Sequence, residues 1–276
     1  MAYTPAKPVP QQPVFPVSAD SEVRMPLPAG SIRDMAPLVA LVHAPVLGPR
    51  SWLPVAEELS RAGSEVVVPA LGGFTRGGPP YAPRLVRLAA ADARAARRDA
   101  VVLVVHSGAG AFVPHIAVAV GGDVVAVFAD AALPSRASGA TVVDAEFLPY
   151  LRELATNGVV PPWPQWWPGE DLSPLFPDEA AREAVCGEAL PLPLEFFAEE
   201  LPALPNGWPP CQAGYLAFSD PYRREADVAA RAGWPVRDLP GGHLHMLMNP
   251  AEVATAITGL AEEALAAGAS LTALPQ

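Results

Sequence analysis

The residue types needed for nucleophilic catalysis occur at three places where an apolar run of this sequence ends. Ser107 comes two residues after the run VVLVV and is followed by Gly108 and Gly110. Asp220 ends the run GYLAFSD, and His243 lies downstream in the stretch LPGGHLHML. A serine becomes a nucleophile when an imidazole takes its proton, a carboxylate holds that imidazole, and N–H groups receive the oxyanion. The order serine, acid, histidine therefore predicts a catalytic triad.

Two of these roles have a second candidate. Asp130 also ends an apolar run, DVVAVFAD, so either Asp130 or Asp220 can supply the carboxylate that holds the imidazole. The structural alternative is a buried Asp130 that only accepts hydrogen bonds from loop amides. His245 alternates with His243 and is a second possible base, although the GGH spacing favours His243.

The apolar runs that must position these residues are short, unalternating and rich in branched side chains. Stretches of helical pattern separate them, a combination typical of strands buried on both faces of a parallel sheet. We therefore expect an α/β fold with a doubly wound, mostly parallel sheet, whose functional groups gather at the carboxyl ends of the strands. The expected strands are 37–43, 64–71, 101–105, 123–130, 214–219 and 234–239.

The helical stretches carry recognisable ends. Ser51 is the expected N-cap of a helix that stops at Gly63, and Asn249 is the expected N-cap of a final helix that begins with Pro250. The expected helices are 51–63, 84–99, 111–120, 223–234 and 249–268.

This regular pattern divides the chain into three parts. Residues 1–35 are rich in proline, and residues 36–133 together with 212–276 form the expected α/β core. Residues 134–211 interrupt the core and hold fourteen of the 35 prolines and four of the six tryptophans. Such a long insertion is usually functional, so we expect either a lid over the site or a patch that packs on the sheet.

Composition excludes several classes of function. The 276 residues include 18 basic and 29 acidic side chains, and the net charge of −11 argues against a nucleic-acid partner. No segment has the length and apolarity of a membrane span or a signal peptide, so a soluble, cytoplasmic protein is expected. The histidines lack zinc-ligand spacing and the glycines lack a nucleotide motif, so no metal and no cofactor are expected. Oligomeric state stays open.

Four stretches in this order resemble motifs of the α/β-hydrolase superfamily. VVLVVHSGAG resembles its nucleophile elbow, LVHAPVLGPRSW its oxyanion loop, YLAFSD its acid strand, and GGHLHMLMNPAEVA its histidine loop. The resemblance covers about residues 37–268 and includes a lid-like insertion. It implies an α/β-hydrolase fold with Ser107 as nucleophile, His243 as base and Asp220 as acid, while some members place the acid at the position of Asp130.

The sequence departs from the family pattern at the elbow and in the oxyanion loop. Val105 and Ala109 replace the two glycines of G-x-S-x-G, and Val105 needs room there. The resemblance implies one oxyanion donor from the Gly108 amide and another from the oxyanion loop, where Pro45 has no N–H to give. Val46 replaces the lost donor if the loop is shifted. The remaining residues expected to line the site are Ala44, His43, His106, Trp166 and Trp167.

These features favour a serine hydrolase that cleaves an ester or thioester of a small, largely apolar molecule. The aromatic insertion, with Trp166 and Trp167, would line the apolar pocket. A second hypothesis keeps the fold but uses His243 as a general base in a lyase or cyclase, because Pro45 weakens the oxyanion hole. A third is a ligand-binding protein with a vestigial triad.

Overall fold

The structure is a computed structural model. It describes residues 37–96, 98–137, 139–167, 171–204 and 206–275. The proline-rich segment 1–35 that the sequence analysis set apart lies outside these residues.

A single six-stranded sheet forms the centre of the molecule. Its strand order is β2-β1-β3-β4-β7-β8, and every neighbouring pair is parallel. All eight residues of the central strand β3 are buried, which explains why its sequence does not alternate. The strands are β1 (Leu38–Val42), β2 (Glu65–Val67), β3 (Ala100–Ser107), β4 (Asp123–Ala131), β7 (Gln212–Ala217) and β8 (Val236–Asp238).

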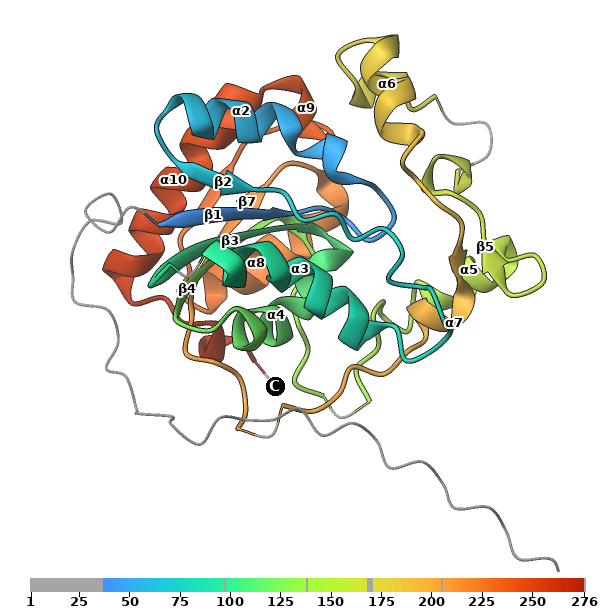
Figure 1. Cartoon of the computed structure of the whole chain (residues 1–276), viewed down its shortest axis with the longest axis horizontal. Helices are drawn as coiled ribbons and strands as arrows, with labels where there is room; N and C mark the ends of the chain where they lie inside the picture. Colours follow the sequence, from blue (N-terminus) through green and yellow to red (C-terminus); the bar gives the residue numbers. More distant parts are fainter. Residues whose placement is uncertain (1–36, 97, 138, 168–170, 205, 276) are drawn as a thin grey trace, which may run out of the picture.

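Helices cover both faces of this sheet (Figure 1). The helices α2, α9 and α10 pack together on one face, and α3 and α4 pack together on the other. The bounds are α2 (Leu53–Arg61), α3 (Ala82–Ala96), α4 (Val113–Val120), α8 (Arg223–Arg231), α9 (His245–Met248) and α10 (Pro250–Ala267). Among the described residues, none of the helices has the length and apolar character needed to cross a bilayer.

The predicted elements all occur, with different ends. The edge strands β2 and β8 are only three residues long, and each pairs on one side alone. Ser51 does not cap α2 but lies in the 3-10 helix η1 (Pro49–Ser51), where its hydroxyl donates to the carbonyl of Gly48. Asn249 precedes α10, but its side chain makes no capping hydrogen bond.

The insertion 134–211 is more regular than its sequence pattern indicates. It contains a two-stranded antiparallel sheet and several short helices, drawn in yellow-green to orange at the right of Figure 1. No single period links these elements, so sequence periodicity does not reveal them. They are α5 (Leu148–Leu154), β5 (Val159–Val160), η3 (Trp163–Gln165), η4 (Ser173–Leu175), α6 (Glu179–Cys186), β6 (Leu192–Pro193) and α7 (Leu194–Phe197).

Buried rings and carboxylates join the insertion to the core. Phe196 of α7 is fully buried and stacks on Phe112, which lies just after β3, with ring centroids 6.3 Å apart. The Glu199 carboxylate accepts hydrogen bonds from the N–H groups of Tyr81 (2.6 Å) and Ala82 (2.8 Å) at the start of α3. A carboxylate at a helix N-terminus is favourable because it satisfies free N–H groups.

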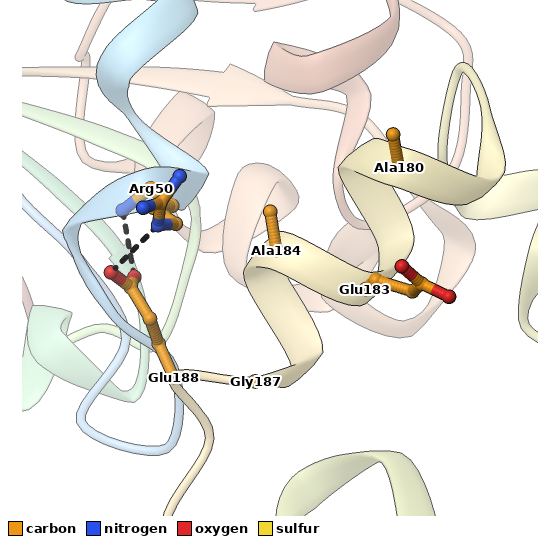
Figure 2. Close-up of a pocket in the computed structure, with 6 residues that line it drawn as sticks. All are labelled: Arg50, Ala180, Glu183, Ala184, Gly187 and Glu188. Atoms are coloured by element: carbon orange, nitrogen blue, oxygen red, sulfur yellow. Dashed lines mark hydrogen bonds and ion pairs between the residues drawn. The ribbon is translucent and has the colours of Figure 1, made fainter.

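A second contact joins the far end of the insertion to the loop after β1. Glu188 accepts a hydrogen bond from the backbone N–H of Arg50 at 2.9 Å and pairs with its guanidinium at 3.3 Å. Figure 2 shows this pair beside α6, at the rim of a hollow of about 590 Å³. Both side chains are partly exposed, so the pair stabilises the fold by no more than about 1 kcal/mol.

Candidate functional site

Ser107 lies at the carboxyl end of β3 in a strained backbone conformation. Its φ of 56° and ψ of −134° fall outside the regions that a serine ordinarily adopts. The chain turns there directly from β3 into the 3-10 helix η2 (Gly108–Phe112) and then into α4. The sharp turn needs close backbone approach at Gly110, where a Cβ atom would lie 1.9 Å from the carbonyl oxygen of Ala132.

The two residues that replace the elbow glycines are accommodated. Val105 is fully buried in β3, where it pairs in register with Val42 on one side and Phe128 on the other. Ala109 is also fully buried. The room that Val105 needs is therefore provided within the sheet.

His243 is held by a carboxylate on the neighbouring strand end. The Nδ1 atom of His243 lies 2.7 Å from Oδ2 of Asp130. Asp130 sits near the end of β4 with a φ of 45°, beside an irregularity in the β3–β4 pairing between His106 and Ser107. Ser107 and Asp130 thus lie at the carboxyl ends of β3 and β4, and the loop after β8 brings His243 to the same end of the sheet.

Asp130 is fully buried, and several donors keep it ionised. Its Oδ1 accepts from the backbone N–H groups of Phe218 (2.9 Å) and Ser219 (3.0 Å), and its Oδ2 also accepts from the Ser219 hydroxyl. Burial by itself raises the pKa of this carboxyl, but the contact with His243 and the hydrogen bonds from Ser219 and Phe218 outweigh it and hold the pKa below its ordinary value. Asp130 is therefore a charged partner for the imidazole.

Asp220 occupies a different position from the one that the superfamily resemblance implies. It begins the 3-10 helix η5 (Asp220–Tyr222) after β7 and is exposed to solvent. The loop that carries it is fixed instead by Phe218 and Ser219, which donate to Asp130. This geometry corrects the preference for Asp220, because the carboxylate that meets His243 is Asp130.

Tyr222 is a site residue that the sequence pattern does not predict. Its hydroxyl lies 3.1 Å from Oγ of Ser107, and its ring stacks on that of His243 with centroids 5.0 Å apart and planes 9° apart. Burial raises the pKa of Tyr222 to about 12, although the hydrogen bond with Ser107 lowers it in part. The only available signal was its position two residues after Asp220, at the end of a predicted strand.

The two histidines expected to flank the site hold loops in place. His106 is fully buried beside His243, with ring centroids 4.4 Å apart, and its Nε2 lies 3.0 Å from the carbonyl oxygen of His243. His43 donates from Nδ1 to the carbonyl of Ala44 at 2.8 Å and accepts at Nε2 from the N–H of Leu71 at 3.2 Å. Burial lowers the pKa of both imidazoles, that of His43 to about 4, so both are neutral.

His245, the second candidate base, points to another part of the fold. Its ring packs against Phe218 with centroids 5.5 Å apart, and its Nε2 lies 3.5 Å from Nδ2 of Asn249 and 3.8 Å from the carboxylate of Glu252. His243, whose Nδ1 meets Asp130, is thus the better placed of the two.

The loop after β1 approaches the elbow through Pro45. Ala44 and Leu47 close a turn, in which the N–H of Leu47 donates to the carbonyl of Ala44 at 3.0 Å. A Cβ atom built on Gly108 would lie 3.9 Å from Cδ of Pro45, the ring carbon that replaces the amide hydrogen. Ala44 is buried and Val46 is half-buried. Pro45 therefore places a ring carbon, and no N–H, on the side of Gly108 where a Cβ atom would stand.

Trp166 and Trp167 belong to a cluster of rings within the insertion. Trp166 is buried and contacts the rings of Phe147, Trp167 and Phe197 at centroid distances of 6.0, 5.9 and 5.8 Å. Its indole N–H donates to the carbonyl of Pro161 at 2.8 Å. The role of the two tryptophans in substrate binding stays a prediction.

Comparison with known proteins gives a family match over most of the chain. The model of a family described as "Alpha/beta hydrolase family" matches residues 39–256. No curated protein matches the sequence.

Solved structures with a similar fold come from several organisms. They include an extracellular α/β-hydrolase from a Paenibacillus species (19% identity, TM-score 0.59, 79% of this chain and 96% of that one), described as sharing structural and functional homology with tobacco salicylic acid binding protein 2. They also include tomato methylketone synthase I in complex with 2-tridecanone (16%, 0.60, 83% and 98%). A third is a pyrethroid hydrolase from Sphingobium faniae JZ-2 (19%, 0.55, 82% and 97%). At these identities the likeness shows a shared fold and nothing finer.

Proposed function

Because this chain belongs to the alpha/beta hydrolase family, we propose that it is a serine hydrolase in which Ser107 is the nucleophile, His243 the base and Asp130 the acid. The observation that carries the proposal is the 2.7 Å contact between Nδ1 of His243 and the buried carboxylate of Asp130. That contact fixes the imidazole with Nδ1 protonated, which leaves Nε2 free to take a proton.

The proposed reaction proceeds through an acyl-enzyme. The Oγ atom of Ser107 attacks the carbonyl carbon of an ester or thioester while His243 takes its proton. The tetrahedral intermediate then collapses, and the alcohol or thiol leaves with the proton from His243. Water attacks the acyl-enzyme with His243 again as base, which releases the carboxylic acid and regenerates Ser107. Asp130 stabilises the imidazolium and keeps its orientation throughout.

The substrate we propose is a small, largely apolar molecule. Support comes from the insertion, where Phe147, Trp166 and Phe197 are in ring contact and Phe197 adjoins Phe196. Phe196 in turn stacks on Phe112, five residues after Ser107. A continuous run of buried rings thus connects the elbow to the insertion, and sites for apolar ligands are predominantly lined by such aromatic side chains.

A non-hydrolytic reaction at the same pocket is the second candidate. It is favoured by one observation: the hydrogen bond recorded for Oγ of Ser107 is with Tyr222, and Pro45 supplies no N–H beside it. In that case His243 acts as a general base without an acyl-enzyme. One of the similar folds is a synthase by name, so the architecture is not restricted to hydrolases.

Hydrolysis of p-nitrophenyl esters and acyl thioesters of increasing chain length tests the proposal. We expect the wild-type protein to release the acid product and Ser107→Ala to lose turnover by about 10⁴-fold or more. Asp220→Asn is the matched control, because that side chain is exposed and away from His243. Hydrolysis that persists in Ser107→Ala would contradict an acyl-enzyme on Ser107 and would favour His243 as a general base that acts without one.

A further inference from the structure

Tyr222 contacts both reacting groups of the proposed triad, and none of the roles assigned above uses it. Its hydroxyl lies 3.1 Å from Oγ of Ser107. Its ring lies flat against that of His243, with centroids 5.0 Å apart. A side chain held in this way has its hydroxyl fixed beside the atom on which the reaction begins.

One donor of the oxyanion hole is missing from its expected place. The family resemblance places this donor at Pro45, which has no N–H and whose Cδ lies 3.9 Å from the position of a Cβ atom built on Gly108. Serine hydrolysis with a single donor is slow, because the loss of one oxyanion donor costs about 100- to 1000-fold in rate. An efficient enzyme of this kind needs a second donor, either the neighbouring N–H of Val46 or the hydroxyl of a side chain such as Tyr222.

We propose, on the basis of the proposed function, that the Tyr222 hydroxyl is a catalytic hydrogen-bond donor to the oxyanion and stands in for the donor that Pro45 lacks. The oxyanion forms on the carbon that is bonded to Oγ of Ser107. A hydroxyl that already lies 3.1 Å from Oγ is therefore within reach of it. The step needs no proton transfer from Tyr222: its O–H donates to the oxyanion, and the Ser107 proton goes to His243.

The phenol keeps its proton over the range in which the reaction runs. Burial is the main cause that raises the pKa of Tyr222 to about 12, and the charges of Asp130, Glu225 and Asp144 act in the same direction. A neutral phenol is a donor, whereas an ionised one would repel the oxyanion.

The position of the acid on β4 explains why the loop after β7 can carry a tyrosine, Tyr222, beside His243. Since Asp130 at the end of β4 holds His243, the loop after β7 does not have to supply the carboxylate. Phe218 and Ser219 anchor that loop on Asp130, and η5 then carries Tyr222 over the imidazole. The same contacts thus fix the acid and the donor.

The first test is Tyr222→Phe, which removes one oxygen and keeps the ring against His243. We expect kcat/KM for a p-nitrophenyl ester to fall about 100- to 1000-fold, with the loss in kcat rather than KM. Inhibition by a trifluoromethyl ketone, which mimics the tetrahedral intermediate, should weaken by a similar factor. Tyr81→Phe is the matched control, because it removes a hydroxyl that lies 3.3 Å from Glu195 instead.

A rescue separates a donor from a merely structural tyrosine. Pro45→Ala returns an N–H to the loop, and we expect it to restore at least about tenfold of the activity lost in Tyr222→Phe. A Tyr222→Phe protein as fast as wild type, or faster because the hydroxyl only blocks Ser107, would overturn the inference. So would a slow Tyr222→Phe protein that Pro45→Ala does not rescue. The proposed function fails separately, if Ser107→Ala keeps its turnover.

Discussion

At the scale of single residues, Asp130 combines two opposing demands. Its carboxylate is fully buried, which disfavours the charge, and it is surrounded by Phe218, Ser219 and His243, which favour the charge and lower its pKa. The sequence places two aspartates at strand ends, but it does not show which of them is the carboxylate partner of His243. That depends on which loop turns toward the imidazole. In the folded chain the side chain of Asp220 is exposed to solvent, a position that the sequence alone does not indicate.

The two aspartates make a matched pair of variants. Asp130→Asn preserves size but removes the charge that stabilises the imidazolium, so we expect kcat to fall about 10³- to 10⁴-fold. Asp220→Asn should change kcat by less than about twofold, because its side chain is exposed and surface changes are usually mild. Steady-state kinetics on a p-nitrophenyl ester gives both numbers. A larger loss in Asp220→Asn than in Asp130→Asn would reverse the assignment.

The buried His43 makes stability depend on pH. Burial lowers its pKa from 6.5 to about 4, so the folded protein keeps it neutral where the unfolded chain binds a proton. The stability that it contributes is present above about pH 6.5 and is lost as the pH falls toward 4, on the order of 3 kcal/mol in full.

Urea unfolding at a series of pH values measures this loss. We expect the free energy of unfolding of the wild type to fall as the pH drops through this window and His43→Gln to show a shallower fall. His106, whose pKa is also lowered by burial, acts in the same direction, so some slope remains. An identical slope in His43→Gln and wild type would contradict the account.

At the scale of elements, the strands were predictable and the turns between them only in part. Runs such as VVLVV predict buried strands because a strand covered on both faces needs apolar residues at every position, and β3 is buried throughout. The elbow at Ser107 was predicted from the strand-end carboxylate and the histidine loop that follow it in order, and not from its glycines. Tyr222 was not, because a tyrosine after a strand has no motif and acquires its role from the way η5 turns toward His243.

The turn at the elbow depends on Gly110. A Cβ atom there would lie 1.9 Å from the backbone oxygen of Ala132, so Gly110→Ala forces η2 and the end of β4 apart. We expect the free energy of unfolding to drop by about 3 kcal/mol or more. Gly72→Ala is the control, because a Cβ atom there meets nothing within 4 Å, and it should change stability by no more than about 0.5 kcal/mol. Equal stability of the two variants would show that the elbow relaxes freely.

At the scale of the whole molecule, ring contacts and hydrogen bonds join the insertion to the α/β core. The family match confirms the predicted superfamily, and the parallel six-stranded sheet with helices on both faces confirms the predicted fold class. The internal structure of residues 134–211 could not be predicted, since its short elements follow no common period and owe their positions to ring contacts. Its role as a lid stays a prediction.

Phe196 packs the insertion against the core. It is fully buried and contacts Phe74, Tyr81 and Phe112. Phe196→Ala should lower the free energy of unfolding by about 3–5 kcal/mol, as measured in urea. Leu190→Ala, at a side chain that is 56% exposed, is the control and should have little effect. A small effect at Phe196 would mean that the insertion and the core are stable independently.

Covalent labelling of Ser107 shows whether this side chain is the nucleophile. A serine activated by His243 and Asp130 reacts with a fluorophosphonate, so the account predicts that the native wild-type protein gains the mass of one phosphonyl group, mapped by peptide mass spectrometry to Ser107. Asp130→Asn should label far more slowly, and heat-denatured protein should not label. Native wild-type protein that stays unlabelled, or that is labelled at a residue other than Ser107, would contradict the account.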